Sequence, residues 1–532
     1  MQTNIVKFPG LRFHSCEKVP IVPVPGFWVP ASNVLPPPDA SIENAHIVSD
    51  LLKPKLSGGA KNLNIIIPVM PALAPVFSCD SKKSQIRAPL KQIESPYSPI
   101  HSEAYRSGRR SCIVASSTSQ GEWSIAEGPN GENYYPDPNG DILIRVKGCG
   151  MWITSDPTPF PGFTTLETTT DHFPDLEVHE VRGVAFPTNA SSEMYASRLI
   201  SQTFEKISLL SGNYPLGFWI YDNLQNDPTP SISKCAAIFL THGDRRLESH
   251  LLTGLEKLLT IKFNQKTVGK SLESVKSLYN FELPSDTNRT YSRVSKLKFN
   301  AISNFILNKQ LDFSYGEIPS LTQDNVKSCG FVPSEDIYNV LSDDVRTFAK
   351  LFGRIGWEVG RCISLVHRTG FLWGTYVDHM QSEEHCNAHC DNLIILSESD
   401  ARRQNGGYQL LAPVDFDMSF SKESAVNFWL DDKCVPDPTM VTHIFPSEVE
   451  NMLVDLAGLT ASVGNTSNIP KREHPEGSLN GMLWLMRDLM VWEFLEGYKD
   501  PSAIRYKGND IMLEDAMQLI KEALKLTENE ES

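Results

Sequence analysis

A polar loop that runs into an apolar strand carries the side chains best suited to chemistry. The loop is His385-Cys-Asn-Ala-His-Cys-Asp-Asn392, it continues into Leu393-Ile-Ile-Leu396, and a later segment, Val414-Asp-Phe-Asp417, ends in acidic residues. Carboxylate and amide oxygens are ligands that Mg²⁺ takes together with phosphate oxygens. The loop and the acidic strand end therefore carry side chains of the types that bind a divalent metal ion, among them Asn392 and Asp415.

A second group of residues lies far upstream, at the end of an apolar stretch. Ile142–Lys147 has the pattern of a strand and leads into Gly148-Cys-Gly150. Because glycines let the backbone approach a ligand closely, a lysine at such a bend is placed to reach phosphate oxygens. Glu193 is the expected partner of Lys147. The plainer alternative is a solvent-facing lysine and a surface glutamate in the first turn of a helix.

The flanking sequence indicates an α+β protein. Strands are predicted at Glu122–Ala126, Ile142–Lys147, Pro215–Tyr221 and Lys234–Leu240. Helices are predicted from near Glu193 (capped by Asn189, Ser191 or Ser192), over 247–262, from Asp343 to near Gly370 with Ser342 at the start, over Ser478–Tyr498, and over 510–526. A chain of 532 residues is too long for one compact core, so two or three domains or lobes are expected, with a β-rich part before a mainly helical part.

Residues 1–120 are rich in proline and serine, which favours extended chain over helix. This segment is predicted to wrap the globular part through Phe27 and Trp28, the alternative being that it binds a partner. The predicted domains are thus an N-terminal extension (1–120), a β-rich N-lobe (121–240) and a mainly helical C-lobe (241–532).

Composition limits the classes of partner. The net charge of −15 and the pI near 5.4 argue against a general binder of nucleic acid or anionic membrane, which needs a basic surface. The most apolar stretch, Ile65–Phe77, is short and interrupted by prolines, so no membrane span is expected. Ten irregularly spaced cysteines fit reduced intracellular thiols. With no signal peptide recognised, the cytoplasm is the predicted location, and a mitochondrial presequence in residues 1–16 stays open.

The polar loop resembles the catalytic loop of protein kinases. The kinase pattern His-x-Asp-x-x-x-x-Asn matches His385 and Asn392, and the strand end at Asp415 resembles the metal-binding one of aminoglycoside- and choline-kinase-like enzymes. The resemblance implies a two-lobed protein-kinase-like fold, in which Asn392 and Asp415 hold Mg²⁺ or Mn²⁺ on the phosphates of ATP. The kinase catalytic aspartate is replaced by Asn387, whose amide cannot accept a proton from a hydroxyl group.

A second resemblance, to the selenoprotein O family of pseudokinase-like protein adenylyltransferases, accommodates that replacement. The motifs that resemble the family occur in the same order over about residues 140–420: Lys147-Gly-Cys-Gly150, Thr158-Pro159, Glu193-Met-Tyr-Ala-Ser197, Pro215-Leu216, Val366-His-Arg-Thr-Gly-Phe371 and Asp391-Asn392. That family lacks the usual aspartate, binds ATP inverted relative to a kinase, and transfers AMP to protein hydroxyl groups. The expected partners are therefore ATP and a protein substrate.

The selenoprotein O resemblance implies a role for each residue of the site. The roles are phosphate binding by Lys147, Gly148 and Gly150, positioning of Lys147 by Glu193, basic contacts to inverted ATP from Arg245 and Arg246, general-base catalysis by Asp391, and metal binding by Asn392 and Asp415. Three features depart from the family: the longer spacing from Lys147 to Glu193, Asp-Phe-Asp in place of Asp-Tyr-Gly, and the loop of some twenty residues that precedes Asp415.

Three alternatives remain at the level of sequence. His385, Cys386, His389 and Cys390, with His379, are ligand types that suit zinc, although a structural zinc site usually draws on two separated pairs. A catalytically inactive scaffold or complex subunit is consistent with Asn387. A phosphotransferase of the small-molecule kinase type would need the missing aspartate.

Overall fold

The computed structural model divides the chain into two compact units. Unit 2 comprises Arg12–Gln202 and Asn213–Asp244, and the described residues of unit 1 fall within Thr203–Gly212 and Arg245–Ser532. The structure describes residues 18–20, 26–31, 103–107, 111–117, 123–125, 142–148, 151–153, 160–162, 164–165, 181–182, 185, 187–221, 233–252, 254–255, 258, 334–378, 383–396, 409–416, 419–421, 448–449, 452–453, 456, 478–503, 505 and 518–526.

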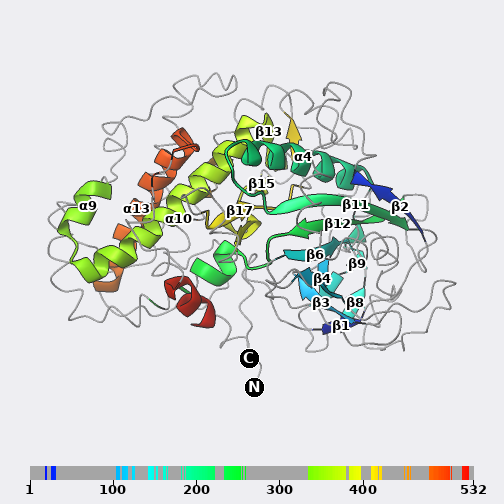
Figure 1. Ribbon diagram of the computed structural model, residues 1–532, viewed down its shortest axis with the longest axis horizontal. Helices are drawn as coiled ribbons and strands as arrows, with labels where there is room; N and C mark the ends of the chain where they lie inside the picture. Colours follow the sequence, from blue (N-terminus) through cyan, green and yellow to red (C-terminus); the bar gives the residue numbers. More distant parts are fainter. Residues whose placement is uncertain are drawn as a thin grey trace. The chain divides into compact units, whose positions relative to one another are not determined.

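An antiparallel sheet forms the body of unit 2 (Figure 1). Its described strands follow the order β1-β3-β4-β6-β12-β11-β2, with β5 paired to β4. The bounds are β1 Lys18–Pro20, β2 Gly26–Pro30, β3 Glu103–Ser107, β4 Ser111–Ser117, β5 Trp123–Ile125, β6 Ile142–Lys147, β11 Asn213–Tyr221 and β12 Cys235–Thr241. The four strands predicted from sequence correspond to β5, β6, β11 and β12, and β6 lies between β4 and β12.

The sheet also draws strands from residues 1–120. β2 pairs antiparallel with β11, with Phe27 opposite Ile220 and Trp28 opposite Trp219. The predicted contact of this segment with the globular part is therefore present, as an added strand. Because β3 and β4 also precede residue 120, the sheet extends across the predicted domain boundary. Two short pairs complete the described β-structure of unit 2: β7 (Met151–Ile153) with β8 (Phe160–Gly162), and β9 (Thr164–Thr165) with β10 (Val181–Arg182).

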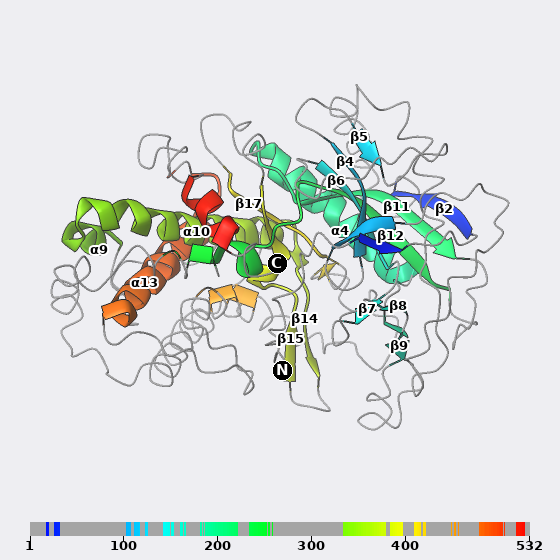
Figure 2. The same cartoon turned by 90° about the horizontal axis from the view of Figure 1, so that it is seen from below.

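Helix α4, Pro187–Lys206, packs on the sheet of unit 2 (Figure 2). Ala190 and Met194 of α4 belong to one buried apolar cluster. Its other buried members are Phe218 of β11 and Cys235, Ala237 and Phe239 of β12. The prediction that this helix begins near Glu193 was wrong, because the helix starts at Pro187. Proline is well suited to a first helical position, where its missing N–H has no partner to lose. Glu193 consequently lies in the second turn, on the buried side.

Two long helices form the core of unit 1. They are α10, Asp343–Arg368, and α13, Ser478–Lys499, and both were predicted from the spacing of their apolar residues. Ser342 is the N-cap residue of α10 as predicted, but its side chain makes no capping hydrogen bond. Gly360 of α10 lies against the backbone of Phe494, so α13 approaches closely there. Short helix α9, Ser334–Val340, precedes α10, and residues 518–526 of the predicted C-terminal helix are helical.

Small elements connect these helices to the polar loop. They are the helical turns η3 (Leu247–Leu252) and η4 (Cys390–Asn392), and the strand pairs β13–β18 (Phe371–Leu372, Phe420–Ser421), β14–β15 (Thr375–Asp378, Glu383–Cys386) and β16–β17 (Leu393–Ile395, Leu411–Pro413). Among the residues that the structure describes, no helix is both long and apolar enough to span a bilayer.

Candidate functional site

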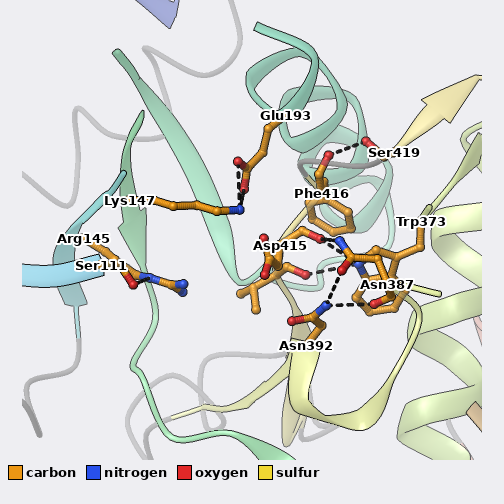
Figure 3. A network of polar contacts seen from close by, with 11 residues as sticks. Ser111, Arg145, Lys147, Glu193, Trp373, Asn387, Asn392, Asp415, Phe416 and Ser419 are labelled. Carbon is orange, nitrogen blue, oxygen red and sulfur yellow. Dashed lines mark hydrogen bonds and ion pairs between the residues drawn. The ribbon is translucent and has the colours of Figure 1, made fainter. Parts of the chain in front are cut away.

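The first group of site residues lies in unit 2, where β6 ends. The Nζ atom of Lys147 is 3.3 Å from Oε2 and 3.4 Å from Oε1 of Glu193 on α4. Lys147 is 5% and Glu193 2% exposed, so this is a buried ion pair (Figure 3). The predicted partnership is confirmed, and the alternative of two solvent-facing side chains is excluded.

Gly148 forms the bend after Lys147. Its φ of +90° is unfavourable for residues with a Cβ atom, and a Cβ there would lie 2.7 Å from the backbone nitrogen of Ala185 and 2.9 Å from the carbonyl oxygen of Cys235. The hydroxyl of Tyr221 donates to the carbonyl oxygen of Gly148 at 3.1 Å. Only glycine therefore fits at this position. Gly150 lies outside the described residues.

A buried thiol and a second cation accompany the ion pair in unit 2. Burial raises the pKa of the Cys235 thiol well above its usual value, and the nearby carboxylate of Glu193 raises it further. Arg145, two residues before Lys147 on β6, is 8% exposed and donates from Nε to Oγ of Ser111 at 3.2 Å. We did not identify Arg145 from the sequence, although the two-residue repeat of a strand places it on the same face as Lys147.

The second group lies in unit 1, where pairing of β16 with β17 brings Asn392 and Asp415 to one end of a hairpin. Leu393 pairs with Pro413, so the residues just before β16 and just after β17 are neighbours. The amide of Val414 accordingly donates to the carbonyl oxygen of Asn392 at 2.9 Å. The two predicted metal ligands are therefore brought together despite the loop that separates them in sequence.

Asn387 connects these two residues. Its Nδ2 donates to the backbone oxygen of Asp415 at 2.8 Å, and its own backbone oxygen accepts from Nδ2 of Asn392, also at 2.8 Å (Figure 3). A further contact, 3.1 Å from Nδ2 of Asn392, is to Nε2 of His389. These contacts orient the amide of Asn392, and no described residue donates to its Oδ1. An amide oxygen of this kind is a ligand type that Mg²⁺ accepts.

Asp415 has an unusual backbone. Its φ is +66°, a left-handed conformation that costs free energy for a residue other than glycine and that is frequent at functional sites. Nε1 of the buried Trp373 donates to the carbonyl oxygens of Val414 at 3.2 Å and Asp415 at 3.1 Å. The Trp373 ring also packs on Phe416, with centroids 5.5 Å apart. Trp373 therefore holds the strained residue in place.

A buried carboxylate anchors Trp373 in turn. Oε2 of Glu448 accepts from the backbone amide of Trp373 at 3.1 Å, and Oε1 accepts from that of Gly374 at 2.8 Å. Nε2 of His367 lies 2.7 Å from Oε2, and its Nδ1 lies 2.7 Å from the Tyr498 hydroxyl. The carbonyl oxygen of Gly374 accepts a hydrogen bond from the backbone N–H of Asn387. We did not identify Trp373 or Glu448 from the sequence; Glu448 lies 75 residues from Trp373, and no local motif links them.

Asp391 and the two predicted arginines also lie in unit 1. Nη1 of Arg246 donates to the backbone oxygen of Asp391 at 2.9 Å, and the backbone oxygen of Arg245 accepts from the Ile395 amide at 2.8 Å. Arg246 is 7% exposed, whereas Asp391 is half-buried. Arg246 thus supports the turn that carries Asp391 and Asn392, a structural contact that the sequence did not indicate.

The donor atoms of unit 1 fit Mg²⁺ better than zinc. An amide oxygen from Asn392 and a carboxylate from Asp415 are hard ligands, and Mg²⁺ commonly takes one or two of these from a protein and the rest from phosphate and water. Within the part of the chain that the structure describes, no group of three or more His, Cys, Asp and Glu side chains is arranged to hold a metal. Of the predicted zinc ligands, Cys390 is buried and His389 contacts Asn392. The side chains of His385 and Cys386, and all of His379, lie outside the described residues.

Comparisons with protein-family models, with curated proteins and with solved structures found no match for this chain.

Proposed function

We propose that this chain is an ATP- and Mg²⁺-dependent protein adenylyltransferase of the selenoprotein O type, with a two-lobed, kinase-like fold. The observation that carries the proposal is the buried ion pair between Lys147, at a strand end beside Gly148, and Glu193 on the following helix. A buried pair of this kind costs desolvation free energy and contributes little net stability, so its presence favours a functional role.

In unit 2, the proposal assigns phosphate binding to Lys147. Its ammonium group is a compact point charge with three donors, and Glu193 fixes its position. Gly148 keeps the backbone beside it free of side-chain bulk. Phosphoryl and nucleotidyl transfer depend mainly on positioning and charge neutralisation, which are the contributions this pair is suited to make.

In unit 1, the proposal assigns Mg²⁺ binding to Asn392 Oδ1 and the Asp415 carboxylate. The metal ion, when bound, would neutralise charge on phosphate oxygens. Asp391 is the proposed general base for the acceptor hydroxyl. Asn387 is unsuited to that role, because its amide cannot accept a proton from a hydroxyl group. Its Nδ2 already donates a hydrogen bond to the backbone oxygen of Asp415. Arg245 and Arg246, in the same unit, are proposed to supply the basic contacts to the inverted ATP.

Labelled ATP separates the candidate functions. Purified protein with Mg²⁺ is incubated with a protein mixture and ATP labelled on the α- or the γ-phosphate. Label transferred only from the α-phosphate supports AMP transfer, and label only from the γ-phosphate would show a kinase instead. Asp391→Asn serves as the variant expected to transfer slowly while still binding ATP, with a rate lower by about 10²–10⁴-fold.

A nucleotide-binding scaffold is the second candidate, and the position of Asn387 favours it. The residue that replaces the kinase aspartate bridges Asn392 and Asp415, so it contributes to structure rather than to proton transfer. A scaffold would show ATP-dependent thermal stabilisation without transfer of either label. Absence of both stabilisation and transfer would exclude the enzyme and the nucleotide-binding scaffold together.

A further inference from the structure

Arg145 is a buried cation on the same face of β6 as Lys147. Residues two apart in a strand project to the same side, and Figure 3 shows both side chains leaving the strand together. On the neighbouring strand β12, Arg145 lies opposite Phe239 and Lys147 lies opposite Ala237. Phe239 and Ala237 belong to the apolar cluster beneath α4. The two cationic side chains of β6 therefore lie on the face of the sheet that α4 covers.

The two cations differ in their partners. Lys147 has the carboxylate of Glu193, whereas Arg145 donates to a neutral hydroxyl, that of Ser111. Within the described part of the chain, no carboxylate pairs with Arg145, which is more than nine-tenths buried. A charge buried without a counter-charge is costly, and a guanidinium retains donors beyond Nε. This arrangement is suited to an anion that enters from outside the chain.

We propose that Arg145 and Lys147 form a binding pair for an oligophosphate, the triphosphate chain of a nucleotide. The inference rests on the proposed function and extends it, because it adds a second phosphate contact in unit 2. The planar guanidinium of Arg145 matches two oxygens of one phosphate, whereas the ammonium of Lys147 acts as a point charge. Glu193 balances one of the two positive charges, so the trio keeps a net charge of +1 toward the ligand.

The test is binding of inorganic tripolyphosphate and of ATP, measured by calorimetry and by thermal unfolding. Arg145→Met keeps a similar length but removes the charge, and we expect it to weaken binding of both ligands by about 10- to 100-fold. Without ligand, Arg145→Met should unfold at the same or a higher temperature than the wild type, because an uncompensated buried charge is gone. Arg145→Lys should recover part of the affinity. Arg198→Met is the matched control, since Arg198 is an equally buried arginine (5% exposed) of α4 in the same unit; it should bind both ligands as the wild type does.

The outcomes separate this inference from the proposed function. Equal affinity of the wild type and Arg145→Met for tripolyphosphate overturns the phosphate pair, as does wild-type binding of ATP without any binding of tripolyphosphate. Tripolyphosphate binding that depends on Arg145, in a protein that transfers no AMP, keeps the pair and refutes adenylyl transfer. If Arg145→Met does not fold, the affinity of Arg145→Lys decides, and unchanged affinity there overturns the two-oxygen contact.

Discussion

At Lys147, stability depends on whether a buried charge keeps its partner. Glu193→Leu removes the carboxylate that pairs with this buried ammonium group, so we expect the free energy of unfolding to fall by about 3 kcal/mol. Lys147→Met combined with Glu193→Leu removes both charges and should recover most of that loss, because an apolar pair of similar volume replaces them. Urea unfolding of the four proteins measures the coupling. A double variant no more stable than Glu193→Leu would contradict this, because the loss would then not come from the lysine charge.

The buried thiol of Cys362 on α10 makes the free energy of unfolding depend on pH in the alkaline range. Burial raises the pKa of its thiol, the carboxylate of Glu358 raises it further, and Arg361 lowers it in part. The unfolded thiol keeps its ordinary pKa of 9.0, so above that pH the unfolded state loses a proton that the folded state retains. The stability linked to this thiol is therefore complete below pH 9 and is lost as the pH rises further. Cys362→Val removes the thiol, and its free energy of unfolding should fall less steeply, by about 1 kcal/mol per pH unit, between about pH 9 and pH 10.5. Parallel slopes for the two proteins would contradict this.

Among the elements, the segment from β13 to the polar loop depends on one carboxylate from elsewhere in unit 1. Glu448→Gln replaces one acceptor oxygen by a nitrogen that cannot accept, so one of the amides of Trp373 and Gly374, or His367, loses its partner. We expect unfolding free energy to fall by about 2 kcal/mol and hydrogen exchange to rise in peptides that cover Trp373–Asn387 and Leu411–Phe416. Affinity for Mg²⁺-ATP should fall with it, since Trp373 supports Asp415. Glu496→Gln is the control, because Glu496 is 30% exposed on α13 and should leave both peptides unchanged.

The elements also show which features a sequence can predict. Long periodic segments such as α10 and α13 were predicted with nearly the observed bounds, because an apolar face repeating every three to four residues leaves few alternatives. The start of α4 was missed, because the polar residues near Asn189 resemble a cap although Pro187 already begins the helix. Glu448, Trp373 and Arg145 were missed for a different reason. Their roles arise from contacts between residues far apart in sequence, or from a strand face that carries no motif.

For the molecule as a whole, the sequence predicted mixed α and β structure, and the described residues contain both. It did not predict that Gly26–Pro30 and Glu103–Ser117 supply strands β2, β3 and β4 to the same sheet, because proline- and serine-rich composition masks short strands. The site residues fall into two groups, Lys147 with Glu193 in unit 2 and Asn392 with Asp415 in unit 1. The proposed function requires that both groups act on the same nucleotide during AMP transfer.

Kinetic non-additivity answers that question. Lys147→Met and Asp415→Ala each remove a group proposed to stabilise charge on the nucleotide, and each should lower AMP transfer by about 10²–10³-fold. If the two groups act in one catalytic step, the double variant should transfer AMP no more slowly than the slower single variant, because residues that act as a unit are strongly non-additive. Single-turnover transfer of label from the α-phosphate, at saturating Mg²⁺ and ATP, gives the four rates. Losses that multiply in the double variant would show that the two units contribute independently. If one single variant transfers AMP at the wild-type rate, the residue that it replaces has no role in the transfer step.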